Sequence, residues 1–61
     1  MRTLIVVPTY NEVENAEPLA RAILAAVPAA QILFVDDNSP DGTGQLVRKL
    51  AAEDRRIHLL A

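Results

Sequence analysis

Three short apolar runs, separated by longer amphipathic segments, form the main pattern along the chain. They occupy residues 4–7 (LIVV), 32–35 (ILFV) and 57–60 (IHLL), and the first two end at Pro8 and Asp36. Hydrophobicity that is continuous rather than alternating is typical of strands covered on both faces, as in a parallel sheet. We therefore expect three strands in a sheet that is covered on both faces.

The segment between the first two runs predicts a helix with one apolar face. Its apolar side chains recur at helical spacing, at Leu19, Ala20, Ile23, Leu24 and Val27. Either Asn11 or Asn15 can cap this helix, and Pro18 then falls in the first turn, where a missing N–H has little consequence. Pro28 is expected to end it.

A second helix is expected after the turn at residues 41–44 (DGTG), with Asp41 or Thr43 as its cap. Its apolar face would carry Leu46, Val47, Leu50 and Ala51. The opposite face is polar and would carry Arg48, Lys49 and Glu53. Two helices therefore connect the three strands.

The order of elements is β-α-β-α-β, and it determines the predicted topology. Connections of this length suit parallel strands, and right-handed crossovers are the rule. The predicted fold class is α/β, with half of a doubly wound, Rossmann-like parallel sheet in the order 3-2-1. We expect residues 1–61 to form a single partial domain with the first strand at an open edge.

Composition excludes several classes of protein. The 61 residues include 6 Lys and Arg, 8 Asp and Glu and no Cys, with a net charge of −2. This charge argues against a nucleic-acid partner, and without cysteine there is no disulfide framework. No apolar run is long enough to span a membrane or to serve as a signal peptide, so we expect a cytoplasmic protein. In so short a chain burial barely offsets conformational entropy, so we expect a partner or a longer parent chain.

The first polar loop, residues 8–12 (PTYNE), follows the first strand. Ligands of doubly wound sheets bind at the carboxyl ends of the strands, which is where this loop lies. The ring of Tyr10 can stack on a base or pack beside a ribose, and Glu12 can accept hydrogen bonds from sugar hydroxyls. The alternative is an ordinary strand-to-helix turn, in which Asn11 caps the helix and Glu12 interacts with its dipole.

The second polar loop, residues 36–42 (DDNSPDG), follows the second strand at the same edge. Asp36 and Asp37 close an apolar strand, so their charges need solvent, a cation or a hydrogen-bond donor. The remaining polar residues of the loop are typical of turns. An EF-hand is excluded because Arg48 occupies the position of its bidentate carboxylate.

Other common catalytic and metal motifs are missing from the sequence. Residues 42–44 (GTG) lack the spacing of either phosphate-binding glycine loop. His58 has no second ligand nearby in sequence and no nucleophile to serve, and no serine has a base partner. We therefore assign no catalytic residue and no metal ligand within the chain.

Residues 6–12 (VVPTYNE) and 35–43 (VDDNSPDGT) together resemble the opening of family 2 of the inverting glycosyltransferases, which have the GT-A fold. Within this family the chain is most similar to polyprenol-phosphate (dolichol-phosphate) mannosyltransferases, over essentially all 61 residues. The resemblance implies an N-terminal segment that binds the nucleotide half of a sugar nucleotide, GDP-mannose in these enzymes. The nucleotide-binding residues that it implies are Pro8, Tyr10, Glu12, Val35, Asp36 and Asp37. Among them, Asp37 would accept a hydrogen bond from a ring N–H of the base.

The same resemblance implies parts that this chain lacks. The D-x-D motif that holds Mg²⁺ or Mn²⁺ against the diphosphate follows a later strand in the family, and no D-x-D occurs here. The general base and the basic residues that meet the lipid phosphate are absent too. We expect the full enzyme to transfer a hexose, mannose from GDP-mannose, to a polyprenol phosphate at the cytoplasmic face of the membrane. The isolated chain is expected to be inactive.

Two alternatives come from other functional classes. Residues 32–38 (ILFVDDN) resemble the first strand and acidic pair of a response-regulator receiver domain, but a strand and a helix precede them here and residues 57–61 contain no Asp. The second alternative is a structural α/β domain that self-associates. Its first strand is apolar and carries no charge that would block pairing, so a homodimer through residues 4–7 is expected.

Overall fold

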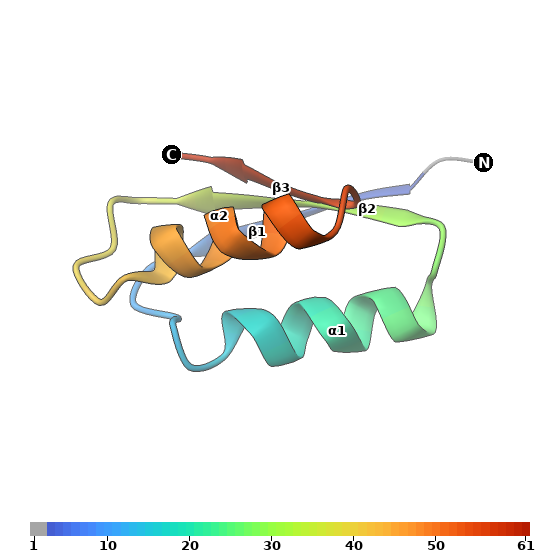
Figure 1. Ribbon diagram of the computed structural model, residues 1–61, viewed down its shortest axis with the longest axis horizontal. Coiled ribbons are helices and arrows are strands. Elements are labelled where there is room, and N and C mark those ends of the chain that lie inside the picture. Colours follow the sequence, from blue (N-terminus) through green and yellow to red (C-terminus); the bar gives the residue numbers. More distant parts are fainter. Residues whose placement is uncertain (1–2) are drawn as a thin grey trace.

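The computed structural model describes residues 3–61 as three strands and two helices (Figure 1). The elements are β1 (Thr3–Thr9), α1 (Ala16–Ala26), β2 (Ala30–Asp36), α2 (Thr43–Glu53) and β3 (Ile57–Leu60). β2 pairs in parallel with both β1 and β3, so the sheet order is β1-β2-β3. This arrangement confirms the predicted α/β class, the element order and the position of the first strand at an edge.

Both helices lie on the same face of the sheet (Figure 1). Two crossovers of one hand place their helices on one face when the strand order runs in one direction, as it does here. Along β2 the residues alternate, and those that face the helices are buried: Ala30, Ile32, Phe34 and Asp36. The expectation of a sheet covered on both faces is therefore wrong for the described residues, because no helix of this chain reaches the second face.

The core lies between the sheet and the helices. Its strand residues follow the register in two rows, Ile32–Ile57 and Val7–Phe34–Leu59. Ala16, Ala20 and Leu24 of α1 and Val47 and Leu50 of α2 pack against these rows. Phe34, at the centre of β2, is fully buried and is the largest side chain in this core.

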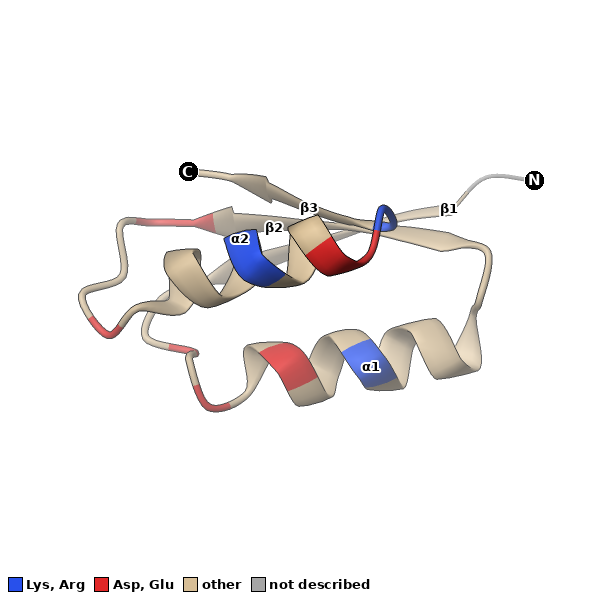
Figure 2. Ribbon diagram, viewed as in Figure 1, with Lys and Arg blue, Asp and Glu red and all other residues tan. Residues whose placement is uncertain are grey.

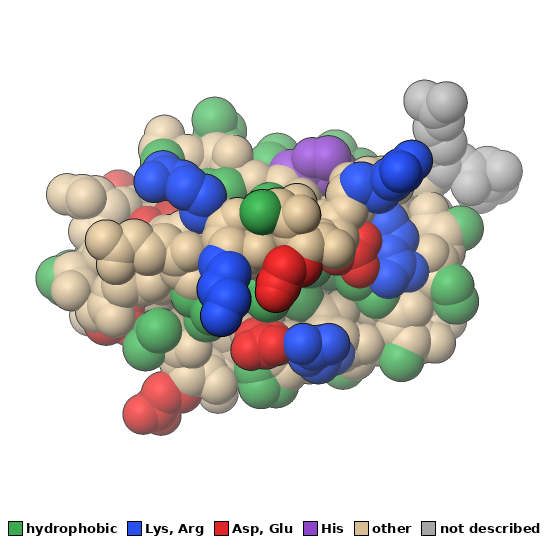
Figure 3. Space-filling model, viewed as in Figure 1, with side chains coloured by type: hydrophobic (Ala, Val, Ile, Leu, Met, Phe, Trp, Pro, Cys, Tyr) green, Lys and Arg blue, Asp and Glu red, His purple; other side chains and the backbone are tan. Residues whose placement is uncertain are grey.

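The second face of the sheet, which we call the open face, is apolar and uncovered. It carries Leu4, Val6 and Pro8 of β1, Gln31, Leu33 and Val35 of β2, and His58 and Leu60 of β3. Leu4 is 58% exposed and Val6 and Leu60 are each 55% exposed. His58, purple in Figure 3, lies on this side, where its Nε2 is 2.8 Å from Gln31 Oε1 on the neighbouring strand.

Helix α1 differs in detail from the prediction. Asn15 is its N-cap residue, but the side chain of Asn15 makes no capping bond and instead donates from Nδ2 to Glu12 Oε2 at 3.1 Å. Ala16 joins the buried face, whereas Leu19 and Val27, which the apolar spacing assigned to it, are 42% and 41% exposed. Leu19 and Val27 stay exposed because no second layer of the described residues lies outside α1.

Helix α2 begins at Thr43, inside the predicted turn of residues 41–44, and neither Asp41 nor Thr43 is its N-cap residue. Gly42 is its N-cap, with φ of 91°, a left-handed conformation that glycine adopts without strain. At the other end, Arg56 pairs with Asp54 (Nη2–Oδ2 2.7 Å) and donates from Nη1 to the carbonyl of Pro28 at 3.0 Å. These contacts tie the start of β3 to the connection between α1 and β2.

Candidate functional site

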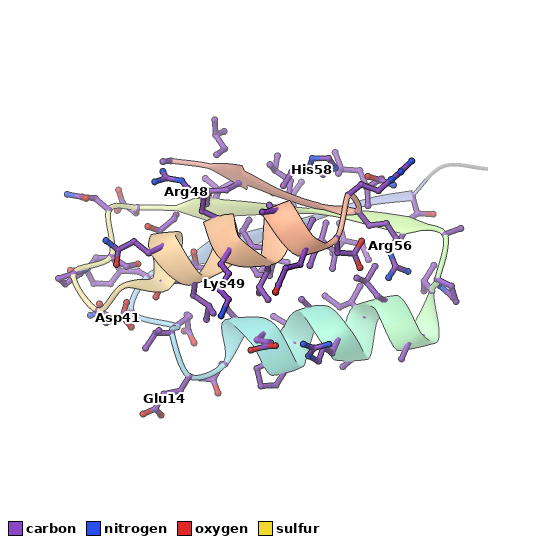
Figure 4. The ribbon with its side chains drawn as sticks, viewed as in Figure 1. Glu14, Asp41, Arg48, Lys49, Arg56 and His58 are labelled. Atoms are coloured by element: carbon purple, nitrogen blue, oxygen red, sulfur yellow. The ribbon has the colours of Figure 1, made fainter. Side chains whose placement is uncertain are left out.

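Two loops meet at the carboxyl edge of the sheet. The first loop (residues 10–15) follows β1, and the second loop (residues 37–42) follows β2. Thr9 and Asp36 are partners in the register, and the N–H of Asp37 donates to the carbonyl of Thr9 at 3.2 Å, so the pairing continues into the second loop. Asp41 and Glu14, labelled in Figure 4, lie at this end of the molecule. The parallel pairing therefore brings the two sequence motifs into contact.

Three successive backbone amides of the first loop donate to side chains that follow β2. The pairs are Asn11 N–H with Ser39 Oγ (3.0 Å), Glu12 N–H with Thr43 Oγ1 (2.9 Å) and Val13 N–H with Asp41 Oδ2 (3.1 Å). We call this set, Ser39, Asp41 and Thr43 with the amides of residues 11–13, the loop clasp. It fixes the backbone of the first loop relative to the second.

Asp36 anchors the base of the clasp. Only 7% of Asp36 is exposed, and its Oδ1 accepts hydrogen bonds from Thr9 Oγ1 (3.1 Å) and from the hydroxyl of Ser39. Its Oδ2 accepts from the N–H of Ser39 at 3.1 Å. The hydrogen bond from the Ser39 hydroxyl is the main reason that the pKa of Asp36 lies below its ordinary value. The sequence indicated no partner for the Asp36 carboxylate, and the structure shows that hydrogen-bond donors of the chain itself stabilise its charge.

Asp41 anchors the other side of the clasp. Its Oδ1 accepts hydrogen bonds from the N–H of Thr43 (3.0 Å) and from the Thr43 hydroxyl, while Oδ2 accepts from Val13. The hydroxyl of Thr43 lowers the pKa of this carboxyl below its ordinary value, and the backbone bonds lower it further. Asp41 therefore bonds to the first N–H of α2, although Gly42 is the N-cap residue, and it also holds the first loop, which the sequence did not indicate.

The residues implied to bind nucleotide divide between the two faces of the sheet. Pro8 and Val35 are register partners on the open face. Tyr10, 56% exposed, and Asp37, also exposed, follow in the loops directly beyond them. Asp36 lies on the opposite, helix-covered face. The structure thus brings Pro8, Val35, Tyr10 and Asp37 to one corner and sets Asp36 apart, whereas their roles in binding stay a prediction.

Glu12 is the sixth implied residue, and it lies at the start of α1. Its carbonyl accepts from the N–H groups of Asn15 and Ala16, and its carboxylate accepts from Asn15 Nδ2. It also lines a cavity of about 190 Å³ beside the edge of β1, whose other walls are Val7, Pro8, Thr9, Asn15, Ala16 and Leu19. Ligand pockets usually enclose about 300–1,000 Å³, so this cavity is smaller than a nucleoside site.

The described residues do not supply a metal site. Within residues 3–61 no group of three or more His, Cys, Asp or Glu side chains is arranged to hold a cation. Asp36 is engaged by Thr9 and Ser39, which leaves Asp37 as the one exposed carboxylate of the acidic pair. A Mg²⁺ or Mn²⁺ ion therefore finds no matching set of ligands in this part of the chain. The two helices of the same range are also too short and too polar to span a bilayer.

Sequence reasoning missed the contribution of Thr9, Ser39 and Thr43. Serine and threonine in loops commonly bond to nearby backbone groups, and this favoured a local turn. Their partners here lie 27 to 31 residues away, across the parallel pairing. The strand register predicts such a contact, but only once the exact pairing of β1 with β2 is known.

A family model for glycosyl transferase family 2 matches residues 4–61 of the chain. The chain belongs to glycosyl transferase family 2. The match includes both loops and every described strand and helix except the first residue of β1. Membership confirms the predicted family, and the three parallel strands are consistent with the Rossmann-like part of a GT-A domain.

Several curated relatives of this family 2 chain are named for mannosyl transfer to, or synthesis of a mannose derivative of, a polyprenol phosphate. The undecaprenyl-phosphate mannosyltransferase of Micrococcus luteus is 47% identical over 60 residues, which cover 98% of this chain and 25% of the relative. The polyprenol monophosphomannose synthase of Mycolicibacterium smegmatis is 48% identical over 60 residues, or 97% and 23% of the two proteins. The dolichol-phosphate mannosyltransferase of Saccharomyces cerevisiae is 31% identical over 61 residues, or 92% and 23%. The chain thus spans about a quarter of their length, and no solved structure matches it significantly.

Proposed function

We propose that this chain is the N-terminal, nucleotide-binding part of a glycosyltransferase that transfers a hexose, mannose from GDP-mannose, to a polyprenol phosphate. One observation carries the proposal: the two loops with family motifs meet at the carboxyl edge of a parallel sheet and are bonded to each other there. Ligands of doubly wound sheets bind at this edge. The names of the curated relatives support the lipid acceptor and the mannosyl group.

The corner formed by Pro8, Val35, Tyr10 and Asp37 supplies the groups that a nucleoside needs. Pro8 and Val35 form an apolar floor, and the exposed ring of Tyr10 offers a face for stacking. The carboxylate of Asp37 accepts a hydrogen bond from a ring N–H of the base. Glu12, next along the first loop, accepts hydrogen bonds from ribose hydroxyls.

The charge of this edge is unfavourable for a diphosphate. In Figure 2 the two loops carry acidic segments and no basic ones. Five carboxylates lie in and beside them, those of Glu12, Glu14, Asp36, Asp37 and Asp41. Like charges repel the diphosphate, so the donor needs a divalent cation, Mg²⁺ or Mn²⁺, held by ligands beyond the described residues. Such a cation would supply positive charge beside the diphosphate leaving group, which a lipid phosphate oxygen would displace at the anomeric carbon with inversion.

A nucleoside titration tests the proposal directly. Guanosine added to the ¹⁵N-labelled chain is expected to shift the amide signals of Tyr10 and Asp37, weakly and saturably. GDP without Mg²⁺ is expected to bind less tightly than guanosine, because its phosphates meet the acidic loops. The full-length Micrococcus luteus relative should bind GDP tightly when Mg²⁺ is present.

Matched variants define the outcome of that titration. Asp37→Asn is expected to weaken guanosine binding, while Glu53→Gln, a charge-neutralising change at the exposed end of α2, should leave it unchanged. Guanosine that shifts no signal at the carboxyl edge would contradict the proposal. Equally tight GDP binding by the chain and by the full-length relative would show that residues 1–61 suffice for nucleotide binding, against the expectation.

We also propose that the chain self-associates, because the structure leaves the apolar open face and the edge of β1 uncovered. Edge strands without charged residues are templates for pairing with another chain. A receiver domain has no comparable support, since the chain belongs to glycosyl transferase family 2 and β3 carries no aspartate. A location at the cytoplasmic face of the membrane is proposed for the full enzyme, where the polyprenol phosphate acceptor would be met.

A further inference from the structure

We propose that Ser39, Asp41 and Thr43 are positioning residues for the donor site. Through the loop clasp they hold the first loop in the conformation that presents Tyr10 and Glu12 to the nucleotide. The inference rests on the proposed function, and it assigns a role to side chains that do not themselves touch the ligand. Their pattern in the sequence is that of an ordinary turn, so the role comes from the bonds across the two loops.

The first loop needs external support to hold its shape. Asn11 has φ of 55°, a left-handed conformation that is unfavourable for most L-residues and is tolerated by asparagine. The amides of residues 11–13 precede α1, so no helical carbonyl is available to them. Each of the three instead donates to a different side chain of the clasp. A strained conformation persists where surrounding bonds determine it in this way.

The clasp is itself held rigidly, because its hydrogen bonds form two closed rings. In the first ring Thr9 donates to Asp36, the Ser39 hydroxyl donates to Asp36, and the Asn11 amide donates to Ser39. Asn11 lies two residues after Thr9, so the ring closes through the chain itself. It joins the ends of both strands to the start of the first loop.

The second ring connects the first loop to the start of α2. The Glu12 amide donates to Thr43 Oγ1, whose hydroxyl in turn donates to Asp41 Oδ1. The Val13 amide donates to Asp41 Oδ2, which closes the ring. Thr43 is fully buried, and its backbone N–H is bonded to the same aspartate. Glu12 and Val13 are thus attached to a helix that packs in the core.

This arrangement affects affinity through preorganisation. A loop that is already ordered loses less conformational entropy when a ligand binds than a loop that must first become ordered. Tyr10 lies directly before the three clasped amides, so freeing them also frees its ring. We therefore expect the clasp to contribute to nucleotide affinity without any contact with the nucleotide.

Residue-specific amide exchange tests the clasp, since each variant should release its own partner. Ser39→Ala is expected to speed exchange of the Asn11 amide, Thr43→Val that of Glu12, and Asp41→Asn that of Val13. Loss of one hydrogen bond corresponds to an increase of roughly three- to ten-fold. Exchange at Phe34, in the central strand, should stay within about two-fold of the wild type, which separates local release from global unfolding.

Conservative variants and a control complete the exchange experiment. Thr43→Ser keeps the hydroxyl and is expected to restore protection of Glu12, although it removes a buried methyl group. Thr3→Val makes the same chemical change as Thr43→Val at an exposed position far from the loops, and should alter none of the three amides. Failure of the hydroxyl to rescue Glu12 would overturn the proposal.

Guanosine titration of the same variants supplies the functional measurement. We expect Thr43→Val and Ser39→Ala to weaken binding by roughly three- to ten-fold, and Thr43→Ser to bind like the wild type. If the wild type binds guanosine and the variants with faster loop exchange bind equally well, the positioning role is wrong and the proposed function stands. If the wild type itself does not bind guanosine, the proposed function is wrong and the positioning role falls with it.

Discussion

At the scale of single residues, short polar side chains hold the carboxyl ends of β1 and β2 together through hydrogen bonds. Asp36 illustrates the point, because burial alone would make its charge unfavourable, and three hydrogen bonds from Thr9 and Ser39 stabilise it. Gly44 of α2 lies beside this carboxylate in space, and a Cβ added at Gly44 would be 3.0 Å from Asp36 Oδ2. The carboxylate therefore depends on a glycine in α2 for space as well as on its donors.

Gly44→Ala is expected to displace the Asp36 carboxylate and to weaken its bonds to Thr9 and Ser39. Alanine favours a helix over glycine by about 1 kcal/mol, yet we expect a net loss of about 1 kcal/mol in the free energy of unfolding. Urea denaturation measures the change. Gln45→Ala, at the next and exposed position of α2, is the control and should be neutral or slightly stabilising. A Gly44→Ala variant more stable than the wild type would show that the carboxylate moves freely.

Asp54 makes stability depend on pH in the acid range. Hydrogen bonds from Arg56 lower the pKa of Asp54 from 3.8 to about 2. A group whose pKa is depressed by folding contributes stability above its unfolded pKa and loses it as pH falls through the folded value. The contribution of Asp54 is thus complete above about pH 4 and declines between about pH 4 and pH 2.

Thermal melts of Asp54→Asn across this range provide the measurement. The variant should be less stable than the wild type at pH 7, and the difference should shrink as pH falls toward 2. Asp36 and Asp41, whose pKa values are also lowered, act in the same direction and will leave some acid sensitivity in the variant. A difference that stays constant from pH 7 to pH 2 would argue against the ion pair as its cause.

At the scale of elements, packing against a single layer decides which apolar residues of a helix are buried. The spacing in α1 assigned Leu19 and Leu24 to one apolar face, but Leu24 is buried and Leu19 is 42% exposed. The apolar spacing predicts which side of the helix faces the sheet. How much of that side is buried depends on the width of the sheet. Three strands cover only part of that side.

Leu24→Ala is accordingly expected to destabilise the chain far more than Leu19→Ala. Truncating a buried leucine typically lowers the free energy of unfolding by about 2–5 kcal/mol, whereas exposed truncations usually stay below about 1 kcal/mol. Urea midpoints or loss of helical circular dichroism distinguish the two variants. Similar effects for both would mean that Leu19 is covered in solution, as it would be in an assembly.

The fold was predictable from the sequence to the extent that local patterns determine it. Apolar runs and helical spacing predicted all three strands and both helices, and the crossover lengths predicted parallel pairing. Continuous apolar runs such as residues 32–35 predicted a sheet with helices on both faces, whereas helices cover one face here. The runs could not reveal this, because a strand has the same apolar sequence when its second face is covered by another layer of a larger domain. The loop clasp was also missed, since the partner of Thr43 lies 31 residues away and depends on the register.

At the scale of the whole molecule, the two faces of the sheet are unequal. One face is packed against both helices, and the open face exposes Leu4, Val6 and Leu60. No Asp, Glu, Lys or Arg lies on the strand positions of the open face, so nothing there repels a second apolar surface. The open face is therefore an apolar surface that the described part of the chain leaves uncovered.

Sedimentation over a range of concentrations tests the proposed self-association. The wild type is expected to show a mass that rises with concentration, and Val6→Lys should shift it toward the monomer, because an edge lysine blocks strand pairing. Ala52→Lys, an added lysine at an exposed position of α2, is the control and should not change the association. A monomer mass for the wild type at every concentration would contradict self-association.

The central position of β2 has a consequence for the route by which the chain folds. β2 is the one described strand with two neighbours, so the first pairing formed is either β1 with β2 or β2 with β3. Paired residues are 27 apart in the first case (Thr3 and Ala30) and 25 apart in the second (Ile32 and Ile57). The entropies of closing loops so similar in length differ by less than about 0.1 kcal/mol. We therefore expect two nucleation pathways that loop entropy does not distinguish, and the packing of α1 or of α2 on Phe34 decides which of them is faster.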